Sequence, residues 1–259
     1  MITIVRRSRF SGRSAAVFPV VMALVSAGCH QTNPNKLWEI VHEQCVPAEL
    51  QHRDPMPCVQ INLIGGEVEG DVLLKDIHGP YQYLLIPTAR RSGIESPELL
   101  GVAGARYIAD AWEGRHFVEK ALKHELPSDH VSLAVNSEYG RSQEQLHIHI
   151  DCLKAEVRSA LHAHLAGITE QWRALEVPLA GKHYRARRVT GAQAADFNPF
   201  RMLADSSPEA ANEMGRHTLV VVGAVFEDGS PGFVLLDDRA SLWPFDRAHG
   251  EELQDELCQ

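Results

Sequence analysis

The sequence lacks the patterns that identify several common classes of protein. It contains no CxxC pair, no P-loop, no glycine-rich dinucleotide fingerprint and no internal repeat. These absences argue against a zinc ribbon, a thioredoxin-like centre, a P-loop nucleotidase and a Rossmann dehydrogenase. The apolar run over residues 15–25 is about half of the roughly 20 residues that a membrane-spanning helix needs.

Acidic residues are missing from the start of the chain, where the first is Glu39 and four arginines precede it. From residue 30 onward the chain has 25 − 4 = 21 basic and 34 acidic residues, a formal charge of −13, compared with −9 for the whole chain. So acidic a chain is poorly suited to nucleic acid, and we expect no such partner. An anionic substrate would need a locally positive pocket.

Residues 1–29 predict an export signal, with an arginine-rich start, the apolar run, and then Ser26-Ala27-Gly28-Cys29. The last residues resemble a bacterial lipobox, which predicts lipidation of Cys29. Ordinary cleavage or an uncleaved anchor are the alternatives. In each case we expect the rest of the chain at the inner membrane, facing the periplasm or the cell exterior.

The four remaining cysteines are an even number, as expected for disulfides in an oxidising compartment. They are Cys45, Cys58, Cys152 and Cys258. A bridge between the first two would stabilise a proline-containing segment without helical or strand periodicity. Four cysteines allow three pairings, and the sequence leaves the choice open.

The most informative stretch is residues 142–151, where polar and apolar residues alternate. Alternation predicts a strand with one buried face, so His147 and His149 should point the same way. A strand with a solvated outer face would show the same pattern. The residues before it favour a site, because a strand ending in Asn136 and a turn at Gly140 bring further polar groups to this place.

The groups gathered there are typical of phosphate binding and attack on phosphorus: a carboxamide, a guanidinium, a hydroxyl and imidazoles. Asn136, the turn Gly140-Arg141-Ser142-Gln143 and the pattern Gln145-x-His147-x-His149 resemble the histidine triad superfamily of nucleotide hydrolases and transferases. The first triad position is glutamine here. One register makes His147 the nucleophile; the other makes it His149, with Asp151 third.

A larger part of the chain, from about Leu37 to Leu236, resembles one branch of that superfamily, the CDP-diacylglycerol pyrophosphatases. The segments that carry the likeness are Leu74-Lys75-Asp76-x-x-Gly79-Pro80-x-Gln82-Tyr83-Leu84-Leu85-x-Pro87-Thr88, Glu95-Ser96-Pro97, Ala186-Arg187-Arg188-Val189-Thr190 and Phe197-Asn198-Pro199-Phe200.

The resemblance implies hydrolysis of CDP-diacylglycerol to CMP and phosphatidate through a covalent nucleotidyl-histidine, with no cofactor and no metal. It implies a small nucleotide-lipid substrate and a membrane-anchored enzyme, and self-association into a homo-oligomer stays open. The predicted catalytic residues are His147 and His149. The predicted substrate-binding residues are Asn136, Arg141, Ser142, Gln143, Asp76, Arg90 and Arg187.

Two of these arginines have an alternative interpretation. Arg90 follows an apolar strand and could simply be solvated, and Arg187 belongs to a basic run, residues 185–188, that could be a charged edge strand. The acidic segment 251–259 gives no functional signal.

The patterns together predict an α+β fold, with a HIT-like antiparallel sheet, flanking helices and a strand-rich C-terminal extension. Hairpins are expected near residues 59–75 and around Asp228-Gly229, and long amphipathic helices over residues 96–127 and 154–165. We expect an anchor segment at 1–29, a catalytic domain at 30–180 and an extension at 181–259 packed on the same core.

Two other functions remain open. The pattern His147-x-His149-x-Asp151 resembles the opening of the metallo-β-lactamase motif, which would make the protein a metal-dependent phosphoester hydrolase. However, that motif continues with a histidine where this chain has Cys152, so a second metal would lose a ligand. The third possibility is a non-catalytic lipoprotein that binds nucleotides or anionic lipid.

Overall fold

The computed structural model describes residues 33–190 and 197–259. The predicted export signal and the predicted lipidation site at Cys29 lie outside the described residues. Within the described residues, no helix is both long enough and apolar enough to cross a membrane.

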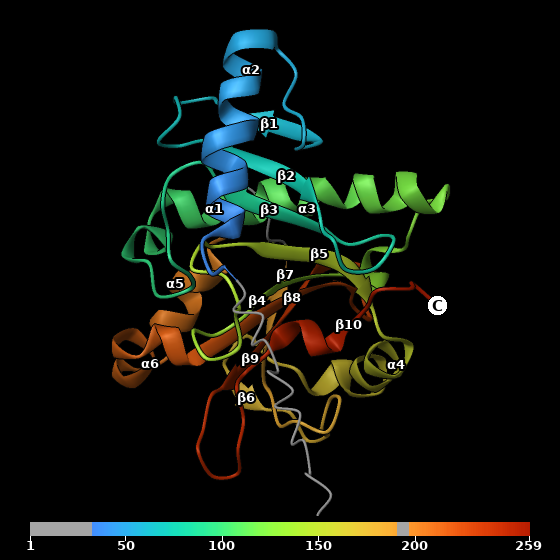
Figure 1. The fold of residues 1–259 in the computed structure, drawn as a ribbon. Helices are drawn as coiled ribbons and strands as arrows, with labels where there is room; N and C mark the ends of the chain where they lie inside the picture. The colour runs from blue at the N-terminus through green and yellow to red at the C-terminus, as the bar shows by residue number, and fades with distance from the viewer. Residues whose placement is uncertain (1–32, 191–196) are drawn as a thin grey trace, which may run out of the picture. The chain divides into compact units, whose positions relative to one another are not determined.

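Ten strands and six α-helices make up the described chain (Figure 1). The strands are β1 (Gln60–Asn62), β2 (Asp71–Lys75), β3 (Tyr83–Pro87), β4 (Val131–Val135), β5 (Ile148–Leu153), β6 (Arg173–Ala174), β7 (Arg185–Thr190), β8 (His217–Val225), β9 (Pro231–Arg239) and β10 (Gln254–Asp255). The helices are α1 (Lys36–Ile40), α2 (Val46–His52), α3 (Val102–Leu122), α4 (Ala155–His164), α5 (Pro199–Ala204) and α6 (Pro208–Asn212). A π-helical turn, Val41–Cys45, joins α1 to α2, and a short 3₁₀ helix, η6 (Gly250–Leu253), precedes β10.

All ten strands belong to one sheet in the order β1-β2-β3-β5-β4-β8-β9-β7-β6, and β10 pairs with β5 outside this path. Every named pair is antiparallel. The α+β class with an antiparallel sheet and flanking helices is therefore confirmed. Strands from the predicted extension continue the sheet directly, because β8 pairs with β4.

The hairpins and helices form where turn and capping residues allow them. Gly229, at φ +78°, makes the turn between β8 and β9, a backbone conformation that glycine adopts without a steric penalty. The helix predicted to begin at Ser96 instead starts as a 3₁₀ turn, Pro97–Leu100, and α3 begins at Val102 because the backbone is extended at Gly101.

The predicted histidine strand begins later than expected. β5 starts at Ile148, and residues 136–147 form an irregular segment that packs back on the protein. Gln145 explains this difference, because its buried side-chain amide donates hydrogen bonds of 3.0 Å to the carbonyls of Pro87 and Ala89. This contact holds the chain beside β3 without strand pairing.

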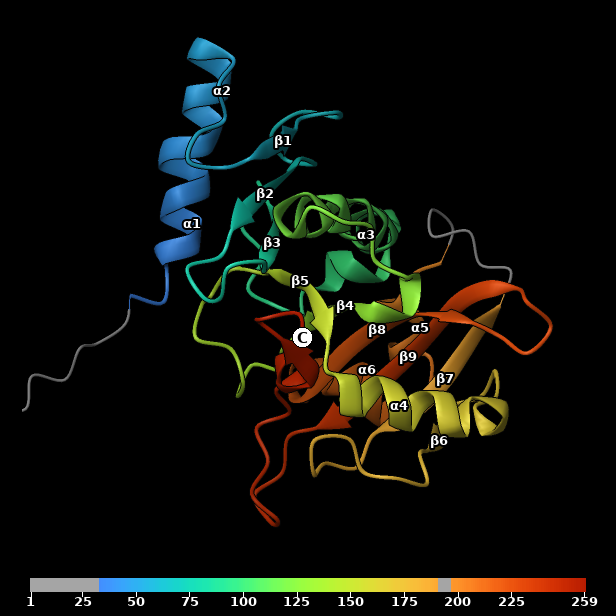
Figure 2. The same ribbon diagram turned by 90° about the vertical axis from the view of Figure 1, so that its right-hand side faces the viewer.

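The two faces of the sheet are covered differently. Ile148 and Ile150 pack with buried residues of α3 in the largest apolar cluster. On the other face, helices α1 and α2 cover β2 and β3, while α4 covers strands further along. In Figure 2, α1 and α2 lie on one side of β1–β3 and α3 lies on the other.

His149 lies between the two apolar clusters of this second face. Its strand partners are Leu84 in β3 and Ala134 in β4. Leu84 belongs to the cluster under α1, and Ala134 to the cluster under α4. Residues directly opposite one another in an antiparallel pair share a face, so the histidine occupies the boundary where the apolar cover is interrupted.

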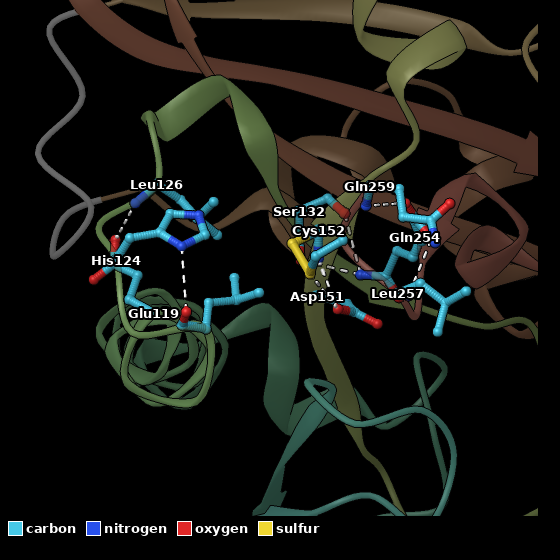
Figure 3. The surroundings of a disulfide bond; sticks show 12 residues. Glu119, His124, Leu126, Ser132, Asp151, Cys152, Gln254, Leu257 and Gln259 are labelled. Atoms are coloured by element: carbon cyan, nitrogen blue, oxygen red, sulfur yellow. Dashed lines mark hydrogen bonds between the residues drawn. A yellow bond between two sulfur atoms is a disulfide. The ribbon is translucent and has the colours of Figure 1, made fainter.

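The described residues form two disulfide bonds, Cys45–Cys58 and Cys152–Cys258. The second joins β5 to the C-terminal segment, which is also held by the side chain of Gln254. Its amide donates to the carbonyl of Ser132 at 3.0 Å and to the carbonyl of His149 at 3.3 Å. Figure 3 shows this junction.

Removing the Cys152–Cys258 bridge should cost more stability than removing Cys45–Cys58, because it closes 106 residues rather than 13. Loop-closure entropy gives roughly 5 kcal/mol for a loop of about 100 residues and roughly 3 kcal/mol for one of about 15. Urea unfolding of the double variants Cys152→Ser/Cys258→Ser and Cys45→Ser/Cys58→Ser measures the difference. Equal losses, or a larger loss for the second variant, would contradict it.

Candidate active site

The two histidines of the predicted motif form a pair. The ring centroids of His147 and His149 are 4.8 Å apart and the ring planes meet at 65°. Their side chains are largely buried, with residue exposures of 7% and 6%. Both residues line one pocket. The two rings therefore lie on the same side of the sheet and are not enclosed in an apolar core.

This pocket has a volume of about 370 Å³ and is bounded by α1, the segment after β2, the 136–147 segment and the chain around η6. Its lining residues are Lys36, Leu37, Ile40, Leu74, Lys75, Asp76, Ile77, His78, Leu84, Asn136, Gly140, Ser142, Gln143, His147, His149, Arg247, His249 and Glu251. Six of the predicted site residues are brought together here: Asp76, Asn136, Ser142, Gln143, His147 and His149.

The three predicted arginines do not line the pocket. Arg141 forms ion pairs with Glu95 at 2.7 Å and with Glu144 at 2.9 Å, so it braces the 136–147 segment. Arg90 lies over the ring of Trp38 with its guanidinium carbon 5.4 Å from the centroid.

Arg187 lies several strands away from β5, the strand that carries His149. It belongs to β7, and the strand order places β7 four positions from β5. Neighbouring strands are about 4.8 Å apart, so roughly 19 Å separates the two strands. Arg187, predicted to bind substrate, is therefore not part of this pocket.

His147 is held in one tautomer by the backbone. Its Nδ1 lies 2.7 Å from the carbonyl oxygen of Gln145. A carbonyl can only accept, so Nδ1 carries the proton and the neutral ring keeps a lone pair on Nε2. Burial, and then the neighbouring His149, lower the pKa of His147 to about 4. The ring is therefore neutral at ordinary pH.

His149 has a different partner, a carboxylate. Its Nδ1 lies 2.9 Å from Oε2 of Glu251, whose other oxygen lies 2.5 Å from Nε2 of His249. Burial alone would raise the pKa of Glu251, but its contacts with the two histidines outweigh this and hold the pKa well below its usual range. The Nε2 atom of His149 is buried, unlike an atom that could attack a substrate.

Sequence reasoning missed His249 and Glu251. The acidic segment from residue 251 was interpreted as having no functional signal, and the structure corrects this by placing Glu251 in the pocket. Their spacing, His249-x-Glu251, could have marked them as a pair of a base and a carboxylate. Their position near His149 could not be predicted, because it depends on the pairing of β10 with β5.

The two amide side chains of the predicted turn differ in what they contact. Gln143 accepts a hydrogen bond from the backbone of Leu37 and donates one to the carbonyl of Asn33, both at 3.0 Å. Its amide thus positions the start of α1. Asn136 accepts weakly from the backbone of Glu251 at 3.4 Å, and no partner for its N–H groups is found among the described residues.

Three cations line this pocket of an acidic chain: Lys36, Lys75 and Arg247. Lys75 Nζ donates to the carbonyls of Asp76 at 2.7 Å and Gly79 at 2.9 Å. Arg247 Nε donates to the carbonyl of Tyr139 at 2.6 Å. These contacts fix positive charge around the histidines, as an anionic ligand requires.

The third residue of the metal-like motif does not join the histidines. Within residues 33–190 and 197–259, the group of His, Cys, Asp or Glu side chains close enough to share a metal is Asp151, Cys152 and Cys258. The two cysteines form a disulfide, so they offer no thiolate. Asp151 is buried, accepts from the backbone of Cys152 at 2.8 Å, and burial raises its pKa to about 7.

Comparison with known proteins identifies the family of the chain. Residues 32–259 match the family model described as CDP-diacylglycerol pyrophosphatase. A CDP-diacylglycerol pyrophosphatase from Yersinia pestis is 44% identical over 228 residues, which cover 88% of this chain and 85% of the relative.

The tautomer and low pKa of His147 predict an unusual titration. The ring should stay neutral with the proton on Nδ1 down to about pH 5 and become protonated only near pH 4. Nitrogen-15 NMR of labelled histidines measures both properties, and a His147→Gln variant assigns the signal. A ring that titrates near 6.5, or that carries its proton on Nε2, would contradict this geometry.

Proposed function

The chain belongs to the CDP-diacylglycerol pyrophosphatase family, and from this premise we propose that His147 attacks the substrate to form a covalent nucleotidyl-histidine. The products are CMP and phosphatidate. The observation that carries the proposal is the hydrogen bond from His147 Nδ1 to the carbonyl of Gln145, which leaves a lone pair on Nε2.

In the first step, Nε2 of His147 bonds to the α-phosphorus of the nucleotide. The bond between that phosphorus and the bridging oxygen breaks, and phosphatidate leaves with the electron pair. In the second step, water attacks the same phosphorus, the P–N bond breaks and CMP is released. Splitting the reaction in this way lowers each barrier, because a neutral imidazole is a good nucleophile and a good leaving group.

The low pKa of His147 suits the first role. A nucleophile must be unprotonated, and burial keeps this imidazole neutral well below neutral pH. In the intermediate, the His147 ring carries a positive charge, and burial makes that charge unfavourable. Burial therefore favours hydrolysis of the nucleotidyl-histidine. This supports His147 over His149 as the nucleophile, since Nε2 of His149 is enclosed.

Positive charge around the pocket stabilises the negative charge that develops on the phosphoryl oxygens. Lys36, Lys75 and Arg247 line the pocket and are held by fixed contacts or by their position on α1. Groups aimed in advance at developing charge are the largest contributors to catalysis of this kind. Asn136 supplies N–H donors, and Asp76 is a candidate for the ribose hydroxyls.

Glu251 is proposed to support proton transfer to the departing phosphatidate. It is an ionised carboxylate between His149 and His249. Such a group stabilises positive charge on His249, which lines the pocket, while that imidazole holds a proton for the leaving oxygen. The predicted domains 30–180 and 181–259 thus both contribute residues to one site.

We also propose that residues 1–29 direct export and that Cys29 is lipidated, so that the catalytic part lies on the periplasmic side of the inner membrane. The two disulfides support an oxidising compartment. An anchor would raise the effective concentration of a lipid substrate.

Replacement of His147 by alanine should lower turnover of CDP-diacylglycerol by about four orders of magnitude or more, since the nucleophile is lost. Brief acid quenching of the wild-type enzyme with labelled substrate should trap a cytidylyl group on His147, located by peptide mass spectrometry. His162→Ala is a matched control, because that histidine is exposed and paired with Asp129.

Three results would overturn this assignment. Near-normal turnover by His147→Ala excludes it as the nucleophile. Loss of activity on strong chelation, restored by a divalent metal, supports the metal-dependent alternative. Stoichiometric binding without CMP release at high protein concentration supports the non-catalytic lipoprotein.

Glu251→Gln should lower kcat about 10- to 100-fold, because it removes a charged partner worth roughly 1.5–3 kcal/mol while keeping the side-chain shape. Initial rates at saturating substrate measure kcat, and circular dichroism checks the fold. Glu176→Gln, an exposed carboxylate paired with His164, is the control. An unchanged kcat for Glu251→Gln would remove Glu251 from the mechanism.

A further inference from the structure

One short loop exposes three large apolar side chains. Leu242, Trp243 and Phe245 are 88%, 94% and 74% exposed. They occupy the segment between β9 and η6, which projects from the sheet as a red loop in Figure 2. Clustered exposed apolar side chains on a soluble surface mark an interaction site, whereas single ones need no explanation.

The loop has a fixed frame. Ser241 and Asp246 exchange two backbone hydrogen bonds of 2.9 Å, which close it at its base. Lys182 Nζ donates to Asp246 Oδ1 at 2.5 Å and ties the base to the β6–β7 connection. The chain therefore forms a hairpin whose tip, rather than whose base, carries the apolar side chains.

We propose that the tip, residues 242–245, inserts into the surface of a phospholipid bilayer and docks the enzyme on the membrane that holds its substrate. The choice of a bilayer rests on the proposed function, because a diacylglycerol nucleotide is embedded in lipid by its acyl chains. A tryptophan together with other large apolar residues is a composition typical of the membrane interface.

The position of the loop in the chain connects it to the pocket. Phe245 precedes Arg247, a pocket-lining residue, by two positions, and Trp243 precedes it by four. Four residues span at most about 14 Å. A lipid headgroup held at the level of the inserted tip is therefore close to the residues that would bind its phosphates.

Charge favours apolar insertion over electrostatic attraction. The chain carries −9 overall, so an anionic bilayer repels it at long range. At the base of the loop, Lys182 is paired with Asp246, and Arg247 donates to the carbonyl of Tyr139. Docking through the tip should therefore depend only weakly on salt.

The full-length variant Leu242→Ser/Trp243→Ser/Phe245→Ser separates docking from chemistry. On phosphatidylcholine vesicles that carry CDP-diacylglycerol, kcat/KM should fall about tenfold or more, the effect of losing about 1.4 kcal/mol of binding. With a monomeric short-chain CDP-diacylglycerol in solution, kcat/KM should match that of the wild type. The single variants Leu242→Ser and Val102→Ser form a matched pair, since Val102 is 87% exposed on α3.

Tryptophan fluorescence tests insertion directly and without turnover. Brominated phosphatidylcholine should quench the emission of Trp243, identified as the part of the signal missing in Trp243→Phe. Absence of quenching would overturn the proposal. A triple variant whose kcat/KM, relative to the wild type, is the same on vesicles as on soluble substrate would also overturn it. The variant Ile64→Ser/Val68→Ser alters exposed residues at the β1–β2 turn. The same fall in kcat/KM on vesicles for this variant would overturn the proposal too. Failure of the wild type to hydrolyse the soluble substrate would count against the proposed function alone, because quenching would still report docking.

Discussion

The hydrogen bond between the ring of His147 and the backbone carbonyl of Gln145 is the contact on which the site depends. It fixes which nitrogen is free, and it works only because Gln145 is itself immobile. The amide of Gln145 donates to two carbonyls beside β3 and its oxygen accepts from the backbone of Arg91 at 3.3 Å. The glutamine at the first position of the triad-like motif therefore fixes the backbone beside β3 and does not provide a third imidazole.

The helices and hairpins could be predicted because their signals are local. Helix α3 follows from apolar spacing, and the turn at Gly229 follows from its dipeptide. The clustering of Asn136 and Ser142 with the histidines could also be predicted from the sequence, since the chain turns back within twelve residues and brings them together. Such inferences need only the geometry of one strand and one turn.

Long-range partners could not be predicted. Arg141 had the right chemistry for phosphate, but Glu95, 46 residues earlier, neutralises it. The place of Glu251 beside His149 could not be predicted because it depends on strand pairing across about 100 residues. The role of a guanidinium or a carboxylate depends on its partner, and a partner that is distant in the sequence cannot be predicted from local patterns.

The bridge between Cys152 and Cys258 has a consequence for the order of events during biosynthesis. Its two cysteines are separated by 106 residues, so it can close only after all of the intervening chain has been made and folded back on β5. The segment with Glu251 lies inside that loop. The disulfide can therefore fasten the segment that contains Glu251 to β5 only late in maturation, after His147 and His149 have been synthesised.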